Sequence, residues 1–239
     1  MTVPPRIPSL SLTLHTARHG TIPVLGDLQL TVMAGETVAV TGPSGIGKTT
    51  LLRVLAGLHR AWSGTLDVSG RVAMVFQEPV LMPWRSALDN LTIATGCTQA
   101  AAEQVLAEVG LVGLGARYPA ALSLGQQRRL ALARAFAARP AVLLLDEAFV
   151  SLDPALAAEM RALFQRLRDA APLATVMVTH DLAEAMALAD RIVRLDGRPA
   201  TIQPVPGEPV ASQPPIQNIG PYLQLSASGV TSSRSYSAR

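Results

Sequence analysis

The chain has 239 residues, of which 49% are hydrophobic and 15% charged, and this length suits one domain with a short appendage. No apolar run approaches the roughly 18 residues of a membrane span, and the N-terminus lacks a signal-peptide pattern, so we expect a cytoplasmic protein. The net charge of +3 comes from scattered arginines, which argues against a nucleic-acid partner, and the single cysteine, Cys97, excludes an internal disulfide.

Short β-branched runs alternate with Ala- and Leu-rich stretches between Ser9 and Pro199, which predicts an α/β domain with a largely parallel sheet. The predicted strands are Leu10–Leu14, Leu28–Val32, Thr37–Thr41, Gly64–Val68, Val72–Phe76, Val142–Asp146, Thr175–Thr179 and Ile192–Leu195. The predicted helices are Lys48–Ala56, Thr98–Val109, Gly125–Ala138, Pro154–Asp169 and Leu182–Leu188. Residues 88–121 carry no strand signal, so we expect a domain over residues 1–199 with a helical subdomain at about residues 88–138.

The composition changes after Pro199. Residues 200–239 contain only three charged side chains, Glu208, Arg234 and Arg239, among many prolines, serines and glycines. We therefore expect a flexible C-terminal tail that is too short for a core of its own.

A glycine-rich loop follows the predicted strand Thr37–Thr41 and precedes a predicted helix. Its residues are Gly42, Pro43, Ser44, Gly45, Ile46, Gly47, Lys48, Thr49 and Thr50, which match the P-loop pattern G-x-x-x-x-G-K-[ST]. Such a loop turns backbone N–H groups toward phosphate oxygens, while Lys48 supplies a compact positive charge and the Thr49 hydroxyl can ligate Mg²⁺. Lys48 is the only lysine of the chain, which agrees with a role that arginine cannot fill.

Two carboxylates end the apolar run Ala141–Leu145. These residues, Asp146 and Glu147, would lie at the strand-end crevice where ligands bind in sheets of this type. Asp146 would then hold Mg²⁺, and Glu147 would polarise the water that attacks a phosphate.

With the P-loop, these residues resemble the ATP-binding subunit of an ABC transporter over about residues 9–198. The signature segment of that family, usually Leu-Ser-Gly-Gly-Gln, has its counterpart in Leu122–Gln126. In the family this segment contacts the γ-phosphate of the ATP held by the other subunit, which implies nucleotide contacts for Ser123, Gly125 and Gln126. Leu124 replaces the first glycine of the usual segment, so we expect a site that still works but with altered properties.

The resemblance also assigns roles to single residues. Gln77 resembles the Q-loop glutamine that contacts Mg²⁺ and the attacking water, and Asp153 resembles the D-loop residue at the dimer interface. His180 resembles the switch histidine that reaches the γ-phosphate. The family stacks an aromatic residue on adenine, and the corresponding position here is His19, with His15 as the alternative.

The fold implied by the resemblance is an ABC-type P-loop ATPase core with a mixed sheet and a small helical subdomain. Its cofactors would be ATP and Mg²⁺. We expect two such subunits to pack head to tail at the cytoplasmic face of the membrane, because the signature residues serve the opposite subunit. Their partners would be permease subunits and, indirectly, a solute-binding protein, with no nucleic acid.

The implied function is ATP hydrolysis that powers solute import. The segment from Phe76 to Leu91 is similar to importers of nitrate, sulfonates and taurine, with thiamine-precursor importers as an alternative. Alternative classes are a non-transport ABC ATPase, a P-loop kinase or GTPase, and a regulatory module with a degenerate site.

Overall fold

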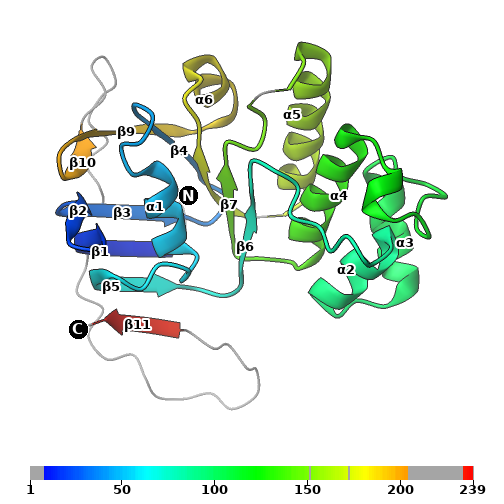
Figure 1. Ribbon diagram of the computed structural model, residues 1–239, viewed down its shortest axis with the longest axis horizontal. Coiled ribbons are helices and arrows are strands. Elements are labelled where there is room, and N and C mark those ends of the chain that lie inside the picture. Colours follow the sequence, from blue (N-terminus) through cyan, green and yellow to red (C-terminus); the bar gives the residue numbers. More distant parts are fainter. Residues whose placement is uncertain (1–7, 151, 172, 204–233, 239) are drawn as a thin grey trace, which may run out of the picture.

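A single mixed sheet organises the chain, and the computed structural model describes residues 8–150, 152–171, 173–203 and 234–238 (Figure 1). The strands are β1 Pro8–His19, β2 Ile22–Leu25, β3 Leu28–Met33, β4 Thr37–Thr41, β5 Trp62–Val68, β6 Val72–Val75, β7 Val142–Asp146, β8 Ala174–Val178, β9 Arg191–Gly197, β10 Ala200–Gln203 and β11 Arg234–Ala238. The helices are α1 Lys48–Leu55, α2 Ala87–Thr95, α3 Gln99–Glu108, α4 Leu124–Ala137, α5 Pro154–Asp169 and α6 Leu182–Leu188, with a 3₁₀ turn at Pro119–Ala121. The predicted α/β class is therefore confirmed.

The centre of the sheet is parallel. Strands β6, β7, β8, β4 and β9 are neighbours in that order, and each adjacent pair runs in the same direction. Every residue of β7 and β8 is buried, as their unbroken apolar sequences predict for strands covered on both faces. The carboxyl ends of these strands consequently lie at one edge of the sheet.

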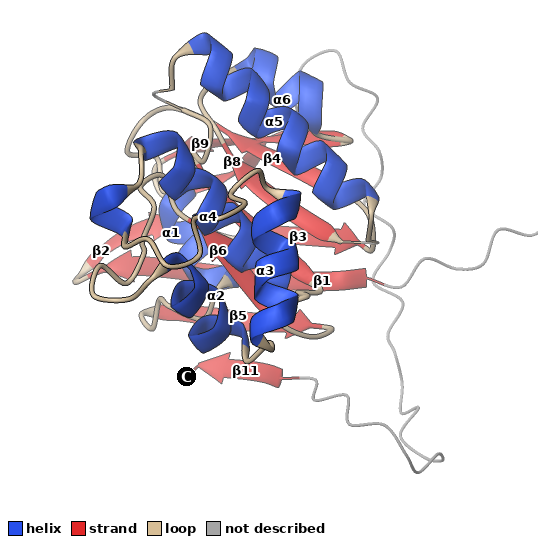
Figure 2. Cartoon of the chain, turned by 90° about the vertical axis from the view of Figure 1, so that its right-hand side faces the viewer, coloured by secondary structure: helices blue, strands red, loops and turns tan. Residues whose placement is uncertain are grey.

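Alternate residues of the parallel strands enter two different cores. Leu143 and Leu145 of β7 pack with residues of α4 and α5, whereas Val142 and Leu144 pack with α1 and the antiparallel strands. This alternation follows from the two-residue period of a strand. The parallel strands are thus covered by α4 and α5 on one face, and by α1 with the antiparallel strands β1, β3 and β5 of the same sheet on the other. Figure 2 shows helices in front of the strands.

The antiparallel part is built around β1, which pairs with β2, β3 and β5. β1 has 12 residues and is longer than the predicted strand Leu10–Leu14, because it continues past register shifts to pair with β2. This extension ends at His19 and brings that residue toward the P-loop helix α1.

The helices α2, α3 and α4 follow one another beside the parallel strands. α2 was not predicted as a separate helix, although it lies in the stretch expected to be helical. Its N-terminus carries a capping box, in which Ser86 and Asp89 each bond the other's backbone N–H. This polar signal is short and stands inside an apolar stretch, which explains why the periodicity alone did not reveal it.

Three short strands, β2, β10 and β11, were not predicted. β2 has only four residues, and β10 lies past Pro199, so the predicted boundary at residue 199 ends four residues too early for the sheet. β10 pairs antiparallel with β9 through a tight connection at Arg198 and Pro199, and the change in composition at that point hid the hairpin. At the far end of the chain, the backbone of β11 pairs with β5. Most of the expected flexible tail, residues 204–233, lies outside the described residues.

We predict that Phe164→Ala lowers the free energy of unfolding by about 3–5 kcal/mol, because the ring is fully buried and packs against Phe136 and Phe149. Urea denaturation followed by circular dichroism measures this loss. Leu182→Ala is the control, since that side chain is 55% exposed, and its effect should stay within about 0.5 kcal/mol. Equal effects of the two substitutions would contradict the packing described for α5.

Candidate functional site

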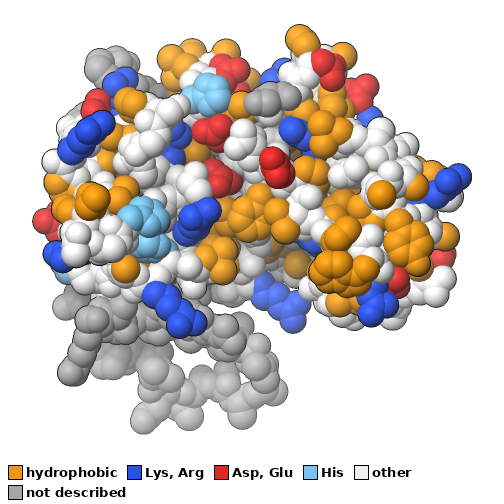
Figure 3. All heavy atoms as spheres, viewed as in Figure 1, with side chains coloured by type: hydrophobic (Ala, Val, Ile, Leu, Met, Phe, Trp, Pro, Cys, Tyr) orange, Lys and Arg blue, Asp and Glu red, His pale blue; other side chains and the backbone are white. Residues whose placement is uncertain are grey.

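The predicted P-loop and catalytic residues follow the ends of four parallel strands. The P-loop follows β4, Gln77 lies two residues beyond β6, Glu147 follows β7 and His180 lies two residues beyond β8. Figure 3 views this edge, where acidic side chains lie between histidine side chains over α6 and beside α1. Parallel pairing thus brings together residues that are more than a hundred positions apart in the chain.

The P-loop wraps around the Lys48 ammonium. Lys48 is only 5% exposed, and its Nζ donates to the carbonyl oxygens of Gly42 at 2.8 Å and Pro43 at 3.0 Å. Because an ammonium has three N–H donors, one remains for an anion. The N-terminus of α1 begins at this residue without a side-chain cap and without an acidic residue in its first turn. Backbone N–H groups and the positive end of the helix dipole therefore face the same place as the ammonium.

Asp146 and Thr49 form the second part of the site. The Thr49 hydroxyl donates to Asp146 Oδ1 at 3.1 Å, and Asp146 is 9% exposed. Burial raises the pKa of Asp146, while the hydrogen bond from Thr49 and the charges of Arg53 and Lys48 act in the opposite direction. A hydroxyl and a carboxylate side by side next to a phosphate-binding loop are the oxygen ligands that suit Mg²⁺. Gln77 is exposed at the same edge of the sheet.

Glu147 and His180 form the third part. Glu147 Oε2 lies 3.4 Å from Nδ1 of His180, so the two predicted catalytic residues are in contact. The backbone of Glu147 has φ 48°, a left-handed conformation that costs about 1–2 kcal/mol for a residue with a side chain. Its N–H donates to the Val178 carbonyl at 3.0 Å, which fixes the turn after β7 against the end of β8.

His19, and not His15, lies next to the P-loop. His19 Nε2 is 3.2 Å from the Thr50 hydroxyl, whereas His15 pairs with Asp27 at the same distance. The ring of His59 meets the ring of His19 edge to face, with centroids 5.2 Å apart. No local pattern indicated His59, because its position depends on β1 returning to the connection between α1 and β5.

The signature residues lie in a separate hollow of about 440 Å³. The hollow is lined by Gly110, Ser123, Gly125, Gln126, Arg129, Asp153, Ala155, Leu156 and Glu159, and none of the P-loop residues, all of which are described, belongs to it. Ser123 caps α4 by accepting from the Gln126 N–H at 3.2 Å, so its own hydroxyl hydrogen remains available as a donor. The structure therefore does not bring these residues to the P-loop of the same chain.

Residues at the starts of α4 and α5 line this hollow. Asp153 caps α5 by accepting from the Leu156 N–H at 3.0 Å. Leu124, the departure from the family pattern, is 52% exposed in the first turn of α4. Ser151, which precedes Asp153 in the expected D-loop, lies outside the described residues.

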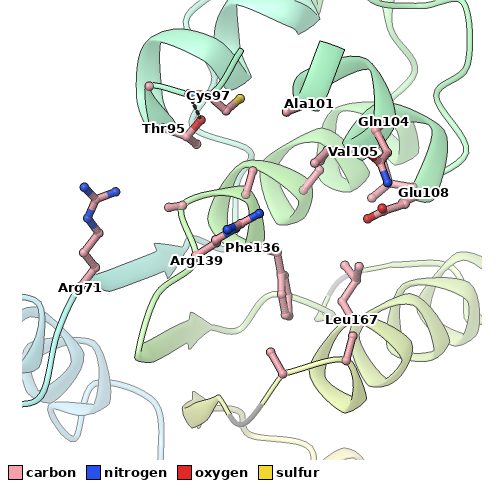
Figure 4. A pocket seen from close by; sticks show the side chains of 17 residues that line it. Arg71, Thr95, Cys97, Ala101, Gln104, Val105, Glu108, Phe136, Arg139 and Leu167 are labelled. Atoms are coloured by element: carbon pink, nitrogen blue, oxygen red, sulfur yellow. Dashed lines mark hydrogen bonds between the residues drawn. The ribbon is translucent and has the colours of Figure 1, made fainter. Parts of the chain in front are cut away.

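A larger cavity of about 580 Å³ lies away from these residues, between α3, α4 and the end of α5 (Figure 4). Arg71 and Arg139 at its border precede β6 and β7, so it opens at the amino ends of the parallel strands. Phe136, Val105 and Leu167 contribute apolar surface to its lining. The cavity is consequently at the opposite edge of the sheet from the P-loop.

Glu184 is a buried acid that the sequence analysis missed. It is 4% exposed on α6, and burial raises the pKa of its carboxyl, while the hydrogen bond with the Thr179 hydroxyl acts in the opposite direction. The available signal was an acidic residue on the apolar face of a predicted helix, which is unusual unless the acid has a partner.

We predict that Gly47→Ala destabilises the protein more than Gly45→Ala. Both glycines have left-handed φ values, 113° and 73°, so both substitutions strain the backbone. At Gly47 the new methyl group would also lie 2.8 Å from Leu25 and 2.9 Å from Val24, whereas nothing lies within 4 Å of a methyl group at Gly45. Urea denaturation of the two variants should give the larger loss for Gly47→Ala, and the reverse order would contradict the loop geometry.

A second prediction concerns pH. Because burial raises the folded-state pKa of Glu184, the folded protein keeps this proton at pH values where the unfolded chain has lost it. Stability from this group therefore falls as the pH rises from the ordinary glutamate pKa to the folded-state pKa. Glu184→Gln removes the titration, so its stability relative to the original protein should grow across that window and then level off. Urea denaturation at a series of pH values tests this, and a difference that shrinks with rising pH would contradict it.

The chain is similar to known proteins over most of its length. Residues 25–150 match the family model described as ABC transporter. The aliphatic sulfonates import ATP-binding protein SsuB of Corynebacterium glutamicum is 43% identical over 185 residues, which are 74% of this chain and 76% of that protein. The protein named SsuB 1 of Agrobacterium fabrum is 46% identical over 76% of this chain and 68% of its own length. The protein of the same name in Pseudomonas savastanoi pv. phaseolicola is 40% identical over 212 residues, which are 87% of this chain and 89% of that protein.

A solved structure has the same fold. It is the dimeric structure of a post-hydrolysis state of the ATP-binding cassette MJ0796 bound to ADP and Pi. The match has a TM-score of 0.70 and 26% sequence identity, and it covers 82% of this chain and 97% of that chain.

Proposed function

The chain belongs to the ABC transporter family and is an ATPase, and from this premise we propose that it is the ATP-binding subunit of an importer for aliphatic sulfonates. The observation that carries the proposal is the arrangement of the site. Lys48, the Thr49–Asp146 pair and the Glu147–His180 pair lie at one sheet edge, while the signature residues lie apart from them. The substrate class comes from relatives that are 40–46% identical and named for sulfonate import.

The P-loop residues would bind the phosphates of ATP. Backbone N–H groups at the start of α1 and the free donor of Lys48 would face the phosphate oxygens. Thr49 and Asp146, with Gln77 at the same edge, would hold Mg²⁺, which supplies positive charge against the β and γ phosphates. His19 lies beside Thr50 and is the residue that we assign to the adenine base.

Glu147 and His180 would carry hydrolysis. The Glu147 carboxylate, 22% exposed, can accept a hydrogen bond from the attacking water and polarise it. His180 is in contact with this carboxylate. Its second ring nitrogen would contact the γ-phosphate. The strained backbone of Glu147 is consistent with a catalytic placement of this side chain.

Hydrolysis would require a second subunit. Ser123, Gly125 and Gln126 surround a hollow that no P-loop residue of their own chain enters. Two chains packed head to tail would place this hollow, with Asp153 at its border, against the ATP of the partner. The dimeric solved structure with the same fold supports this arrangement.

The loop before α2 is a surface that fits a membrane partner. Trp84 is 70% exposed and Val80 is 55% exposed, and hydrophobic side chains gather over this part of the molecule (Figure 3). The buried Asn90 fixes the loop, since its side chain accepts from the Met82 N–H and donates to the carbonyls of Met82, Arg85 and Ser86. An apolar surface that is already ordered loses little entropy when it binds.

We assign this surface to the permease, at the cytoplasmic face of the membrane. Among the described residues, no helix is both long and apolar enough to span a bilayer. In this proposal the permease holds the subunit at the membrane, and a solute-binding protein interacts with the permease and not with this chain. The helices α2 to α4 would act as the subdomain that transmits movement between the nucleotide and this surface.

We predict that Glu147→Gln lowers kcat for ATP hydrolysis by about 10²–10⁴-fold, because the amide cannot polarise the attacking water as a carboxylate does. ATP affinity should change little, and ATP should trap a dimer that size-exclusion chromatography detects. Glu103→Gln, an exposed substitution on α3, is the matched control. Normal hydrolysis by Glu147→Gln would rule out the role assigned to Glu147.

The function itself is tested by purification from detergent-solubilised membranes. We expect a multi-span permease to accompany the tagged chain, and the reconstituted complex to import a radiolabelled alkanesulfonate on addition of ATP. Nitrate or a thiamine precursor as the better substrate would assign a different importer. Recovery of ribosomal proteins without a permease would refute the transport proposal and leave the ATPase activity in place.

Trp84→Ala and Asn90→Ala should both reduce recovery of the permease, because one removes an exposed apolar contact and the other releases the loop that presents it. ATPase activity of the isolated subunit should persist in Trp84→Ala. Leu58→Ala, which removes an exposed side chain after α1, is the control. Unchanged recovery with Trp84→Ala would locate the docking surface elsewhere.

A further inference from the structure

Glu184 is a buried carboxylate that has no role in the hydrolysis mechanism proposed above. It lies on α6, four residues after His180, and only 4% of its surface is exposed. The groups that face it are the Thr179 hydroxyl, the carboxylate of Asp181, the guanidinium of Arg161 on α5 and the ring of His180. Of these, the Thr179 hydroxyl forms a hydrogen bond with it.

The Thr179 hydroxyl connects Glu184 to the turn between β8 and α6. Its oxygen accepts from the Asp181 N–H at 3.0 Å and can donate its own hydrogen to Glu184. The N–H of Thr179 in turn donates to the Val40 carbonyl of β4 at 3.3 Å. The residue before His180 is therefore anchored both to the strand that leads into the P-loop and to the buried carboxylate.

Asp181, the residue after His180, is also held in place by hydrogen bonds. Asp181 caps α6, since its carboxylate accepts from the N–H groups of Ala183 at 2.8 Å and Glu184 at 3.3 Å. His180 thus stands between two residues whose positions are fixed by one small network. Glu184 closes this network, because it contributes a backbone N–H to Asp181 and a carboxylate to Thr179.

The side chain of His180 has little else to hold it. It is 52% exposed, and the side-chain contact that the structure records for it is the one with Glu147 at 3.4 Å. The position of the ring is consequently set by the backbone from Thr179 to Asp181. A small shift of this turn would move the ring relative to the Glu147 carboxylate, and geometry of this kind strongly affects rates.

Packing alone does not account for an acid at position 184. A buried carboxylate is costly unless it is paired, and the hydrogen-bonding side chain here is a neutral hydroxyl. Its buried neighbours on α6, Ala185 and Leu188, are apolar, so an apolar side chain would suit the core at a lower cost.

We propose that Glu184 is a positioning residue for ATP hydrolysis, which acts through the Thr179 hydroxyl to hold His180 against Glu147. The inference rests on the role proposed above for His180. It concerns a residue that does not touch the nucleotide, and its effect is on the placement of the turn.

The test compares Glu184→Leu with Glu184→Gln. Leucine removes the acceptor for the Thr179 hydroxyl, so kcat should fall by about ten- to a hundredfold while KM for ATP stays nearly unchanged. Glutamine keeps a carbonyl acceptor, so it should restore kcat to within about threefold of the original. Met186→Ala is the control on the same helix, since that side chain is 70% exposed.

Thr179→Val supplies an independent measurement if Glu184→Leu folds poorly. It removes the hydroxyl from the other end of the same hydrogen bond and should lower kcat to a similar extent. In the double variant, Glu184→Leu with Thr179→Val, the two effects should not multiply, because both act through one network.

Three outcomes would overturn the proposal. These are an unchanged kcat in Glu184→Leu, an equal loss in Glu184→Gln, and multiplicative effects in the double variant. His180→Ala, measured in the same assay, distinguishes failure of the role proposed for His180 from failure of the role proposed for Glu184. If His180→Ala hydrolyses ATP normally, the proposed role of His180 fails; if only His180→Ala is impaired, the role of Glu184 alone fails.

Discussion

Parallel pairing of β6, β7, β8 and β4 is the constraint on which the rest of the site depends. Each of these strands ends at the same edge, so the residue that follows each strand is delivered to one crevice. The pairing requires that both faces of the strands be covered, and the two cores on either side meet that requirement. The chemistry at the edge is therefore a consequence of apolar burial along the strands.

Several groups at the same edge would each lower the stability of the folded chain if they had no partners. This edge contains a buried ammonium, a carboxylate whose pKa is raised by burial, and a glutamate with a left-handed backbone. For the two charged groups a neighbour offsets part of the cost, as the carbonyls of the P-loop do for Lys48 and the hydroxyl of Thr49 does for Asp146. A bound anion with its metal would satisfy both charges together, which explains why the cost is concentrated at this point.

Local patterns in the sequence predicted most of the strands and helices and the residues at the centre of the site. The P-loop, the acids after β7 and the caps of α4 and α5 are each encoded within a few residues, and their elements were predicted closely. β2 and β10 were missed because short strands of four residues acquire their structure from partners far along the chain. His59, Asn90 and Glu184 were missed for a related reason, since each is defined by which residue lies opposite it in space.

The single lysine has a chemical consequence of its own. Apart from the terminal amine, Lys48 Nζ is the one primary amine of the chain, and it is buried and hydrogen-bonded to two carbonyls. The P-loop must therefore open before an acylating reagent can react there, and one acylation would remove the positive charge from the proposed nucleotide site. Arginine guanidinium groups do not react with such reagents at neutral pH, so amine acylation of the folded chain would report on the P-loop and on the terminal amine only.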